Sequence, residues 1–250
     1  MLGYALLESG SRGNCCLIKS EQAAIVIDCG GTQRYLKTCF NNLNYQVSDT
    51  DALFITHTHS DHVSALNLFK GVDTYSSCLV KTDNFKVIDS YRSVNINDMQ
   101  ITVLPTSHDS FESCGYLIET GDSRLVYITD TGYVSTKVKG MIKNADYYIF
   151  ESNHDIEMLM QTTRPMPIKQ RILSDCGHLC NEDSAEVLCE VIGNKTREIV
   201  LAHISQEANT YQQAREVLVS RLNEVKPDYD IDIRSALQFE MLLGGGLRHD

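Results

Sequence analysis

Residues 54–62 read Phe54-Ile55-Thr56-His57-Thr58-His59-Ser60-Asp61-His62, with three histidines and one aspartate inside six positions. Neutral imidazole and carboxylate groups are ligands that suit zinc or manganese. The whole chain contains only 8 histidines, so an incidental polar loop is a poor explanation for this cluster. The stretch therefore predicts a metal site, and a site of this type with open coordination positions is hydrolytic.

The composition is that of a globular protein, with 250 residues of which 42% are hydrophobic. No apolar stretch is long enough to span a bilayer and no signal peptide is recognised, so we expect a cytoplasmic protein without a membrane partner. The 9 scattered cysteines are expected to be reduced thiols. The net charge of -11 argues against tight non-specific binding of nucleic acid. Residues 164–171 form the densest basic segment, which is expected to be an exposed loop with solvated charges rather than a substrate clamp.

The chain has no repeat, long linker or low-complexity stretch, so we expect a single domain over residues 1–250. Hydrophobic runs bounded by turn residues predict strands at 4–8, 15–19, 23–28, 52–56, 100–104, 125–129, 146–151 and 198–202. Helices are predicted at 32–40 with Thr32 as cap, at 61–69, at 182–192 after a capping Asn181, and at 209–225. This order of strands and helices is typical of a layered α/β fold.

Four residues with metal-binding side chains follow directly after predicted strands, namely His57, His108, Asp130 and His203. Open α/β sheets bind their ligands beyond the carboxyl ends of the strands. One such histidine would more often be structural, but four strand ends with the same chemistry are hard to ascribe to packing. We therefore expect these four side chains to meet.

With these residues identified, the sequence resembles the metallo-β-lactamase-fold hydrolases, whose signature His-x-His-x-Asp-His stands here as His57, His59, Asp61 and His62. Three further motifs resemble the YycJ (WalJ) group, and they are Ser9-Gly10-Ser11-Arg12-Gly13-Asn14, Glu151-Ser152-Asn153-His154-Asp155 and Gly177-His178-Leu179. Where that group usually has serine after Gly-His-Leu, this chain has Cys180, and Arg12 replaces a small residue. The resemblance implies an α/β fold, a four-layer αββα sandwich with two metals in a cleft at its edge.

The resemblance also implies the ligands of the two metals. The first metal is expected on His57, His59 and His108, the second on Asp61, His62 and His203, with Asp130 as the bridging ligand. Two divalent cations, expected to be zinc with manganese or iron as alternatives, would share a hydroxide that attacks the substrate. Asp61 and Asp130 would thus take part in catalysis. Asp28 is expected to support the ligands through hydrogen bonds.

Other motif residues are candidates for contact with the substrate. In related phosphodiesterases of this fold a histidine of a Gly-His motif contacts the scissile phosphate, so His178 is expected to stabilise phosphate charge or protonate the leaving group. His154 is either a substrate contact or a satisfied polar loop residue. Ser11 and Asn14 would face a phosphate, although a tight turn explains their glycine-containing segment equally well. Glu151 and Asp155 are expected to have supporting roles.

These expectations describe a hydrolase of phosphodiester bonds that degrades DNA from the 5′ end and needs no organic cofactor. The alternative is a hydrolase of small esters, thioesters or lactones without a nucleic-acid partner. A catalytically idle protein that only binds nucleic acid is a third hypothesis, against which the complete ligand set argues. His59 stands where flavo-diiron proteins have glutamate, and the segments between ligands are too short for the extra regions of ribonucleases Z and J.

Overall fold

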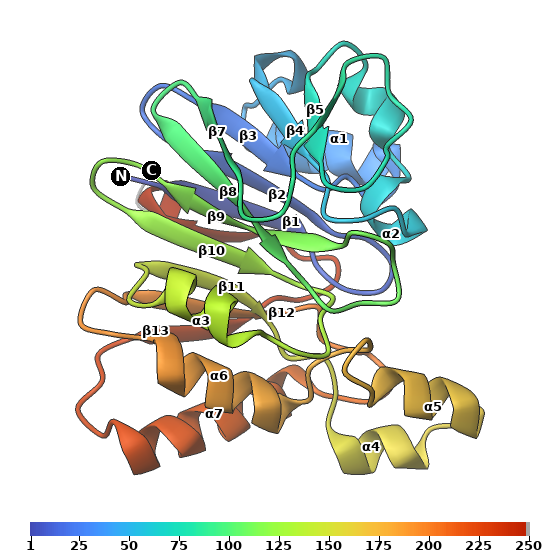
Figure 1. Ribbon diagram of the computed structural model, residues 1–250, viewed down its shortest axis with the longest axis vertical. Coiled ribbons are helices and arrows are strands. Elements are labelled where there is room, and N and C mark those ends of the chain that lie inside the picture. Colours follow the sequence, from blue (N-terminus) through green and yellow to red (C-terminus); the bar gives the residue numbers. More distant parts are fainter. Residues whose placement is uncertain (249–250) are drawn as a thin grey trace.

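Two seven-stranded sheets face each other at the centre of the molecule (Figure 1). The computed structural model describes residues 1–248. The first sheet is antiparallel from β14 to β3 and parallel from β3 to β6, in the order β14-β1-β2-β3-β4-β5-β6. Its strands are β1 (Gly3–Glu8), β2 (Cys15–Lys19), β3 (Ala24–Ile27), β4 (Ala52–Phe54), β5 (Thr74–Ser76), β6 (Phe85–Val87) and β14 (Leu242–Gly245).

The second sheet has the order β13-β12-β11-β10-β9-β8-β7. Its first four members run parallel, and the pairs from β10 to β7 are antiparallel. Its strands are β7 (Ser93–Ile96), β8 (Met99–Pro105), β9 (Cys114–Glu119), β10 (Arg124–Ile128), β11 (Tyr147–Glu151), β12 (Glu198–Ala202) and β13 (Asp232–Ser235). Each sheet thus combines parallel and antiparallel pairs.

The alternation of side chains along β1 explains how the layers pack. Tyr4 and Leu6 point into the core between the two sheets, whereas Ala5 and Leu7 lie in the separate core under α1 (Gln33–Asn42). Both faces of the strand are therefore buried in apolar surroundings, and the hydroxyl group of Tyr4 donates to Glu198 of the opposite sheet at 2.7 Å.

Helices cover the outer face of each sheet. The second sheet packs its outer side chains against α3 (Thr136–Ile142), α6 (Asn181–Val191) and α7 (Tyr211–Val225). The outer core of the first sheet also takes in residues of α2 (Ser60–Val63), η1 (Val47–Asp49), η2 (Leu66–Phe69) and η3 (Gly246–Arg248). At the edge of the sandwich, α4 (Ile156–Gln161) and α5 (Met166–Ile172) share a small core with Ala208 (Figure 1). The order helix, sheet, sheet, helix confirms the predicted four-layer αββα sandwich.

All eight predicted strands are present, with ends that shift by at most two residues. The prediction missed β5, β6, β7, β9, β13 and β14 and the helices α3, α4 and α5. β5 and β6 have only three residues each, which is too short for a recognisable alternation. The segment 164–171 was wrongly predicted as a loop, because Pro165 and Pro167 occur where a helix, α5, begins, and the first helical turn tolerates proline.

Two helix predictions need correction. The helix expected at 61–69 is interrupted, because the carbonyl of His62 accepts from the Cys29 amide and the Ala65 amide donates to the Cys29 carbonyl, at 2.8 Å each. Those two backbone groups are therefore unavailable for a continuous helix. The cap of α6 is Cys180 and not Asn181, since the Cys180 sulfur accepts from the Asp183 amide at 3.4 Å. Thr32 caps α1 as predicted.

Within residues 1–248, none of the helices combines the length and the apolar character that crossing a membrane requires. All nine cysteines carry free thiols, and eight of them are buried.

Candidate metal centre and active site

The carboxyl ends of four strands deliver the predicted ligands to one place. His57 follows β4, His108 follows β8, Asp130 follows β10 and His203 follows β12. In Figure 1 the arrowheads of β8 and β10 point to the side of the molecule where α2, α4 and α5 lie. The short helix α2 adds Asp61 and His62 from the same edge.

The residues at the ends of β3, β10 and β12 have left-handed backbone conformations. Asp28, Asp130 and His203 have φ angles of 57°, 55° and 53°, a region that residues other than glycine seldom adopt. Such a conformation costs on the order of 1–3 kcal/mol and persists where surrounding contacts enforce it. For His203 these contacts are Ser9 Oγ, which accepts from the His203 amide at 2.9 Å, and the Asn153 amide group, which donates to the His203 carbonyl at 2.8 Å.

Asp130 lies at the centre of the ligand-type side chains. Its Oδ2 is 3.2 Å from Nε2 of His62, and its Oδ1 is 3.5 Å from Nε2 of His203 and 3.8 Å from Nε2 of His108. Burial by itself raises the pKa of Asp130, but His203 and His62 outweigh it and hold the pKa well below its usual value. A carboxylate that remains ionised among several imidazoles is placed as a bridging ligand would be.

In each buried histidine of the predicted ligand set, Nδ1 lies within hydrogen-bond distance of a protein oxygen. Nδ1 of His62 is 2.8 Å from Asp28 Oδ2, Nδ1 of His108 is 3.1 Å from the Gly177 carbonyl, and Nδ1 of His57 is 3.1 Å from Thr56 Oγ1. Such hydrogen bonds fix the tautomer of the imidazole and direct Nε2 toward the centre of the cluster, as they do around bound metals. Asp28 thus supports His62 as predicted.

Glu151 performs the same task for two histidines at once. Its Oε1 lies 2.9 Å from Nδ1 of His178 and 2.9 Å from Nδ1 of His203, while its Oε2 accepts from the amides of Thr131 and Leu179. The carboxylate is completely buried, which raises its pKa, but the two histidines outweigh this effect and lower the pKa to about 2. Glu151 is therefore ionised and orients both rings.

The loop that carries His178 can approach the centre only because residue 177 is glycine. A Cβ atom on Gly177 would lie 2.1 Å from the carbonyl oxygen of Ile172. The loop packs against the end of α5 through the amide of His178, which donates to that carbonyl at 3.0 Å. His178 lines the cavity, and with Nδ1 bound to Glu151 its Nε2 makes no hydrogen bond within residues 1–248.

This donor set fits divalent metal ions. The ligand atoms of His57, His59 and His108 lie within 4.8 Å of one another, and so do those of Asp61, His62 and His203. Nε2 of His57 and Nε2 of His203 are buried without a hydrogen-bond partner in the described part of the chain. Burial lowers the pKa of His57 and of His108, which keeps both imidazoles neutral as metal binding requires.

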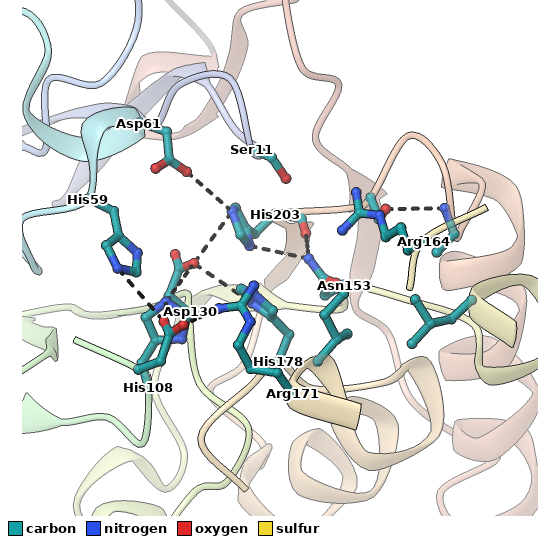
Figure 2. A pocket seen from close by; sticks show the side chains of 15 residues that line it. Ser11, His59, Asp61, His108, Asp130, Asn153, Arg164, Arg171, His178 and His203 are labelled. Atoms are coloured by element: carbon teal, nitrogen blue, oxygen red, sulfur yellow. Dashed lines mark hydrogen bonds and ion pairs between the residues drawn. The ribbon is translucent and has the colours of Figure 1, made fainter. Parts of the chain in front are cut away.

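The cluster forms one end of a cavity of about 320 Å³. Figure 2 shows His59, Asp61, His108, Asp130, His178 and His203 converging on a common space at this end. Of the predicted substrate contacts, Ser11 and His178 line the cavity. His178 lies opposite Asp61 across the cluster and keeps 12% of its side chain exposed, enough to reach a bound molecule.

Two predicted substrate contacts do not reach the cavity. Asn14 is completely buried, and its amide group donates to the Gly10 carbonyl at 3.1 Å and lies 3.0 Å from Nε2 of His62. It thus closes the turn of residues 10–14 and lies against the inward-facing nitrogen of His62, without lining the cavity. His154 is 1% exposed, and neither ring nitrogen has a hydrogen-bond partner within residues 1–248, so it is not the satisfied polar residue of the alternative either. Neither side chain can touch a substrate in this arrangement.

Other residues of the cavity were not predicted. Asn153, Arg164, Arg171 and Ser205 line it, and Asp109 places its Oδ1 3.1 Å from Nε2 of His108. Asn153 belongs to the motif Glu151-Ser152-Asn153-His154-Asp155, so the sequence offered a signal for its place at the cavity. The two arginines were dismissed with the segment 164–171, because no local signal indicates which cations face a cavity.

The comparison with known proteins agrees with this geometry. Residues 24–204 match the family model described as the β-lactamase superfamily domain. The chain is 33% identical over 247 residues to "Exodeoxyribonuclease WalJ" of Streptococcus pneumoniae, covering 92% of both chains. It is 35% identical over 240 residues to "Exodeoxyribonuclease YycJ" of Bacillus anthracis, covering 90% of both.

Among solved structures, the metallo-β-lactamase-fold protein YhfI of Bacillus subtilis superposes with a TM-score of 0.72 at 17% identity, over 97% of this chain and 99% of that one. The fold, the ligand signature and the identity over nine-tenths of the length lead to one assignment. This chain belongs to the β-lactamase superfamily and, within it, to the family of WalJ and YycJ.

Proposed function

We propose that this protein is a metal-dependent DNA exonuclease that removes nucleotides from the 5′ end and works as one cytoplasmic catalytic domain. The observation that carries the proposal is the gathering of seven metal-binding side chains at one end of an open cavity, with His178 facing the same space. The names of the WalJ and YycJ relatives, both exodeoxyribonucleases, support DNA as the substrate.

The proposed ligands divide into two groups around Asp130. His57, His59 and His108 would hold one cation, whereas Asp61, His62 and His203 would hold the other, with Asp130 between them. Zinc suits this set of imidazole and carboxylate groups, and manganese or iron are alternatives. The chemistry that two such cations supply is a nucleophile at neutral pH and neutralisation of phosphate charge.

The protein groups position the phosphodiester and handle the proton of the leaving group. His178 has one nitrogen bound to Glu151 and the other free toward the cavity. When the bond between phosphorus and the leaving oxygen breaks, that oxygen takes a proton from Nε2 of His178, or receives a hydrogen bond from it. Ser11 lies on the opposite wall and can donate its hydroxyl hydrogen to a phosphate oxygen.

The proposal is tested with metal-loaded protein on single- and double-stranded DNA labelled at either end. Release of the 5′ label as a mononucleotide in the first turnovers, with a gradual ladder from the 3′-labelled strand, is expected. A panel of small esters, thioesters and lactones is measured in parallel. Hydrolysis of those esters without degradation of DNA would replace the proposal by the small-molecule alternative.

A further inference from the structure

The cavity beside the metal-binding cluster continues into a second hollow. The first hollow has a volume of about 320 Å³ and the second about 110 Å³. Ser11, Arg164 and Ser205 line both of them, so the two are adjacent parts of one depression. The second hollow leads away from the cluster toward Arg12 and Gln238.

Three arginines line this depression on a protein whose net charge is -11. The short helix α5 delivers two of them, with Arg171 in its last turn and Arg164 just before its first residue. Arg12 lies in the turn between β1 and β2 and lines the second hollow. In Figure 2, Arg171 lies beside His178 and Arg164 lies on the far side of Asn153 from the cluster.

Arg164 and Arg171 each bind a carboxylate through one nitrogen of the guanidinium group. Nε of Arg164 donates to Glu207 Oε2 at 2.8 Å, while its two Nη groups make no hydrogen bond within residues 1–248. Arg171 pairs through Nη1 with Asp109. The side chain of Arg164 is 32% exposed. A planar guanidinium fixed at one nitrogen and open at the others is suited to bind a phosphate with two hydrogen bonds.

From these contacts we propose that the joined hollows form a groove for the sugar–phosphate backbone of one DNA strand, extending from the metal centre past Arg171 and Arg164 to Arg12. The inference rests on the proposed nuclease function and adds where the strand lies. Phosphate contacts of this kind set the position of a strand without selecting its sequence. The lining also carries Asp61, Asp109, Asp130 and Glu207, so the groove is not positive as a whole. The three guanidinium groups are the cations along it that a phosphate backbone can meet.

The groove is tested by fluorescence anisotropy with the metal-loaded full chain and a labelled single strand whose linkages are phosphorothioates, which slows hydrolysis. Arg164→Ala is expected to weaken binding by roughly tenfold, the loss for a charged hydrogen bond. The slope of log K against log salt should fall by about 0.7, as expected for one lost phosphate contact on a single strand. Arg164→Lys should keep the salt slope and lose part of the affinity, because lysine retains the positive charge but lacks the planar guanidinium donors.

Arg197 provides the matched control. It also forms a single ion pair, with Asp146 at 3.7 Å, and is exposed, but it stands at the opposite end of β12 from His203. Arg197→Ala should bind the strand as the parent does. Glu207→Gln should tighten binding, because it removes the carboxylate that competes for Arg164. If Arg197→Ala loses as much affinity as Arg164→Ala, or if Glu207→Gln weakens binding equally, the groove is refuted.

Replacing single charged phosphates of the strand by neutral linkages shows which phosphate Arg164 contacts. One methylphosphonate placed at successive positions should weaken binding to the parent, and at one position this penalty should vanish in Arg164→Ala. Unchanged affinity and salt slope in Arg164→Ala, with DNA still degraded, would overturn the groove and leave the nuclease function intact. A parent protein that hydrolyses no DNA would overturn the function itself. The melting temperature of each variant shows whether the fold is retained.

Discussion

Oε1 of Glu151 lies 2.9 Å from Nδ1 of His178, and this contact links the end of β11 to the loop before α6. The same oxygen is 2.9 Å from Nδ1 of His203. One buried carboxylate therefore orients a proposed metal ligand and a proposed catalytic histidine together. The shared hydrogen bond makes the orientation of the two rings interdependent, although 25 residues separate them in sequence.

Replacing Glu151 by Gln is expected to lower both metal affinity and activity by roughly 10–100-fold, the usual cost of losing a partner of a ligand histidine. The amide keeps the size of the side chain but carries no charge and offers only one acceptor atom. Metal content, kcat/KM on DNA and the melting temperature are the measurements. Glu190→Gln, an exposed change on α6, serves as the control. Parent-like metal content and turnover in Glu151→Gln would contradict the supporting role.

His178→Ala should retain its metal and its fold, while turnover on DNA falls by roughly 10²–10⁴-fold, the range for a lost general acid. Hydrolysis of an activated diester, whose leaving group needs no proton, distinguishes protonation of the leaving group from stabilisation of phosphate charge. An equal loss on both substrates means that His178 stabilises phosphate charge and donates no proton.

His154→Ala tests the buried position of that histidine. It should lower the melting temperature and leave turnover per folded molecule close to that of the parent, because the ring is enclosed.

Purified protein is expected to contain about two divalent ions per chain, as a two-metal site requires. Asp130→Ala should lose at least one of them and reduce kcat/KM by roughly 10³-fold or more, because both groups of ligands lose the carboxylate between them. Elemental analysis before and after chelation is the measurement, with activity restored by added zinc or manganese. A chelated, metal-free protein that remains active would exclude the assignment.

The buried side chain of Glu8, which is not among the proposed metal ligands, predicts a pH-dependent stability of the fold. It is 1% exposed between Gly13 and Gly31, and its Oε2 has no hydrogen-bond partner in the described structure. Burial raises its pKa to about 7, although Gln238 acts in the opposite direction. The folded state thus retains a proton that the unfolded state releases near 4.5, so its stability contribution is complete below that pH and is lost as the pH rises through 7.

Glu8→Gln should therefore raise the melting temperature at pH 8 by roughly 2–4 °C, the shift for about 1 kcal/mol in a chain of this size. The difference between variant and parent should disappear at pH 4, where both carry a neutral side chain. Thermal unfolding at several pH values gives the comparison. A variant that is less stable than the parent at pH 8 would show that Glu8 is bound as a carboxylate.

The sequence by itself was sufficient for the layered architecture and for the prediction that His57, His108, Asp130 and His203 meet at one place. The strands before His57, Asp130 and His203 are continuous apolar runs, which local pattern identifies well. Since β10, β11 and β12 are parallel, their carboxyl ends lie at one edge, and the residues that follow them are brought together. Ligand chemistry and strand ends are both local properties, so they can be recognised without coordinates.

Only the tertiary structure decided which way the other motif residues point. Asn14 and His154 belong to recognisable motifs but are buried, whereas Arg164 and Arg171, dismissed as loop cations, line the cavity. Glu151 meets His203 across 52 positions of the chain. The direction of a side chain depends on backbone angles at strand ends and on which distant segment packs there, and neither leaves a periodic signal in the sequence.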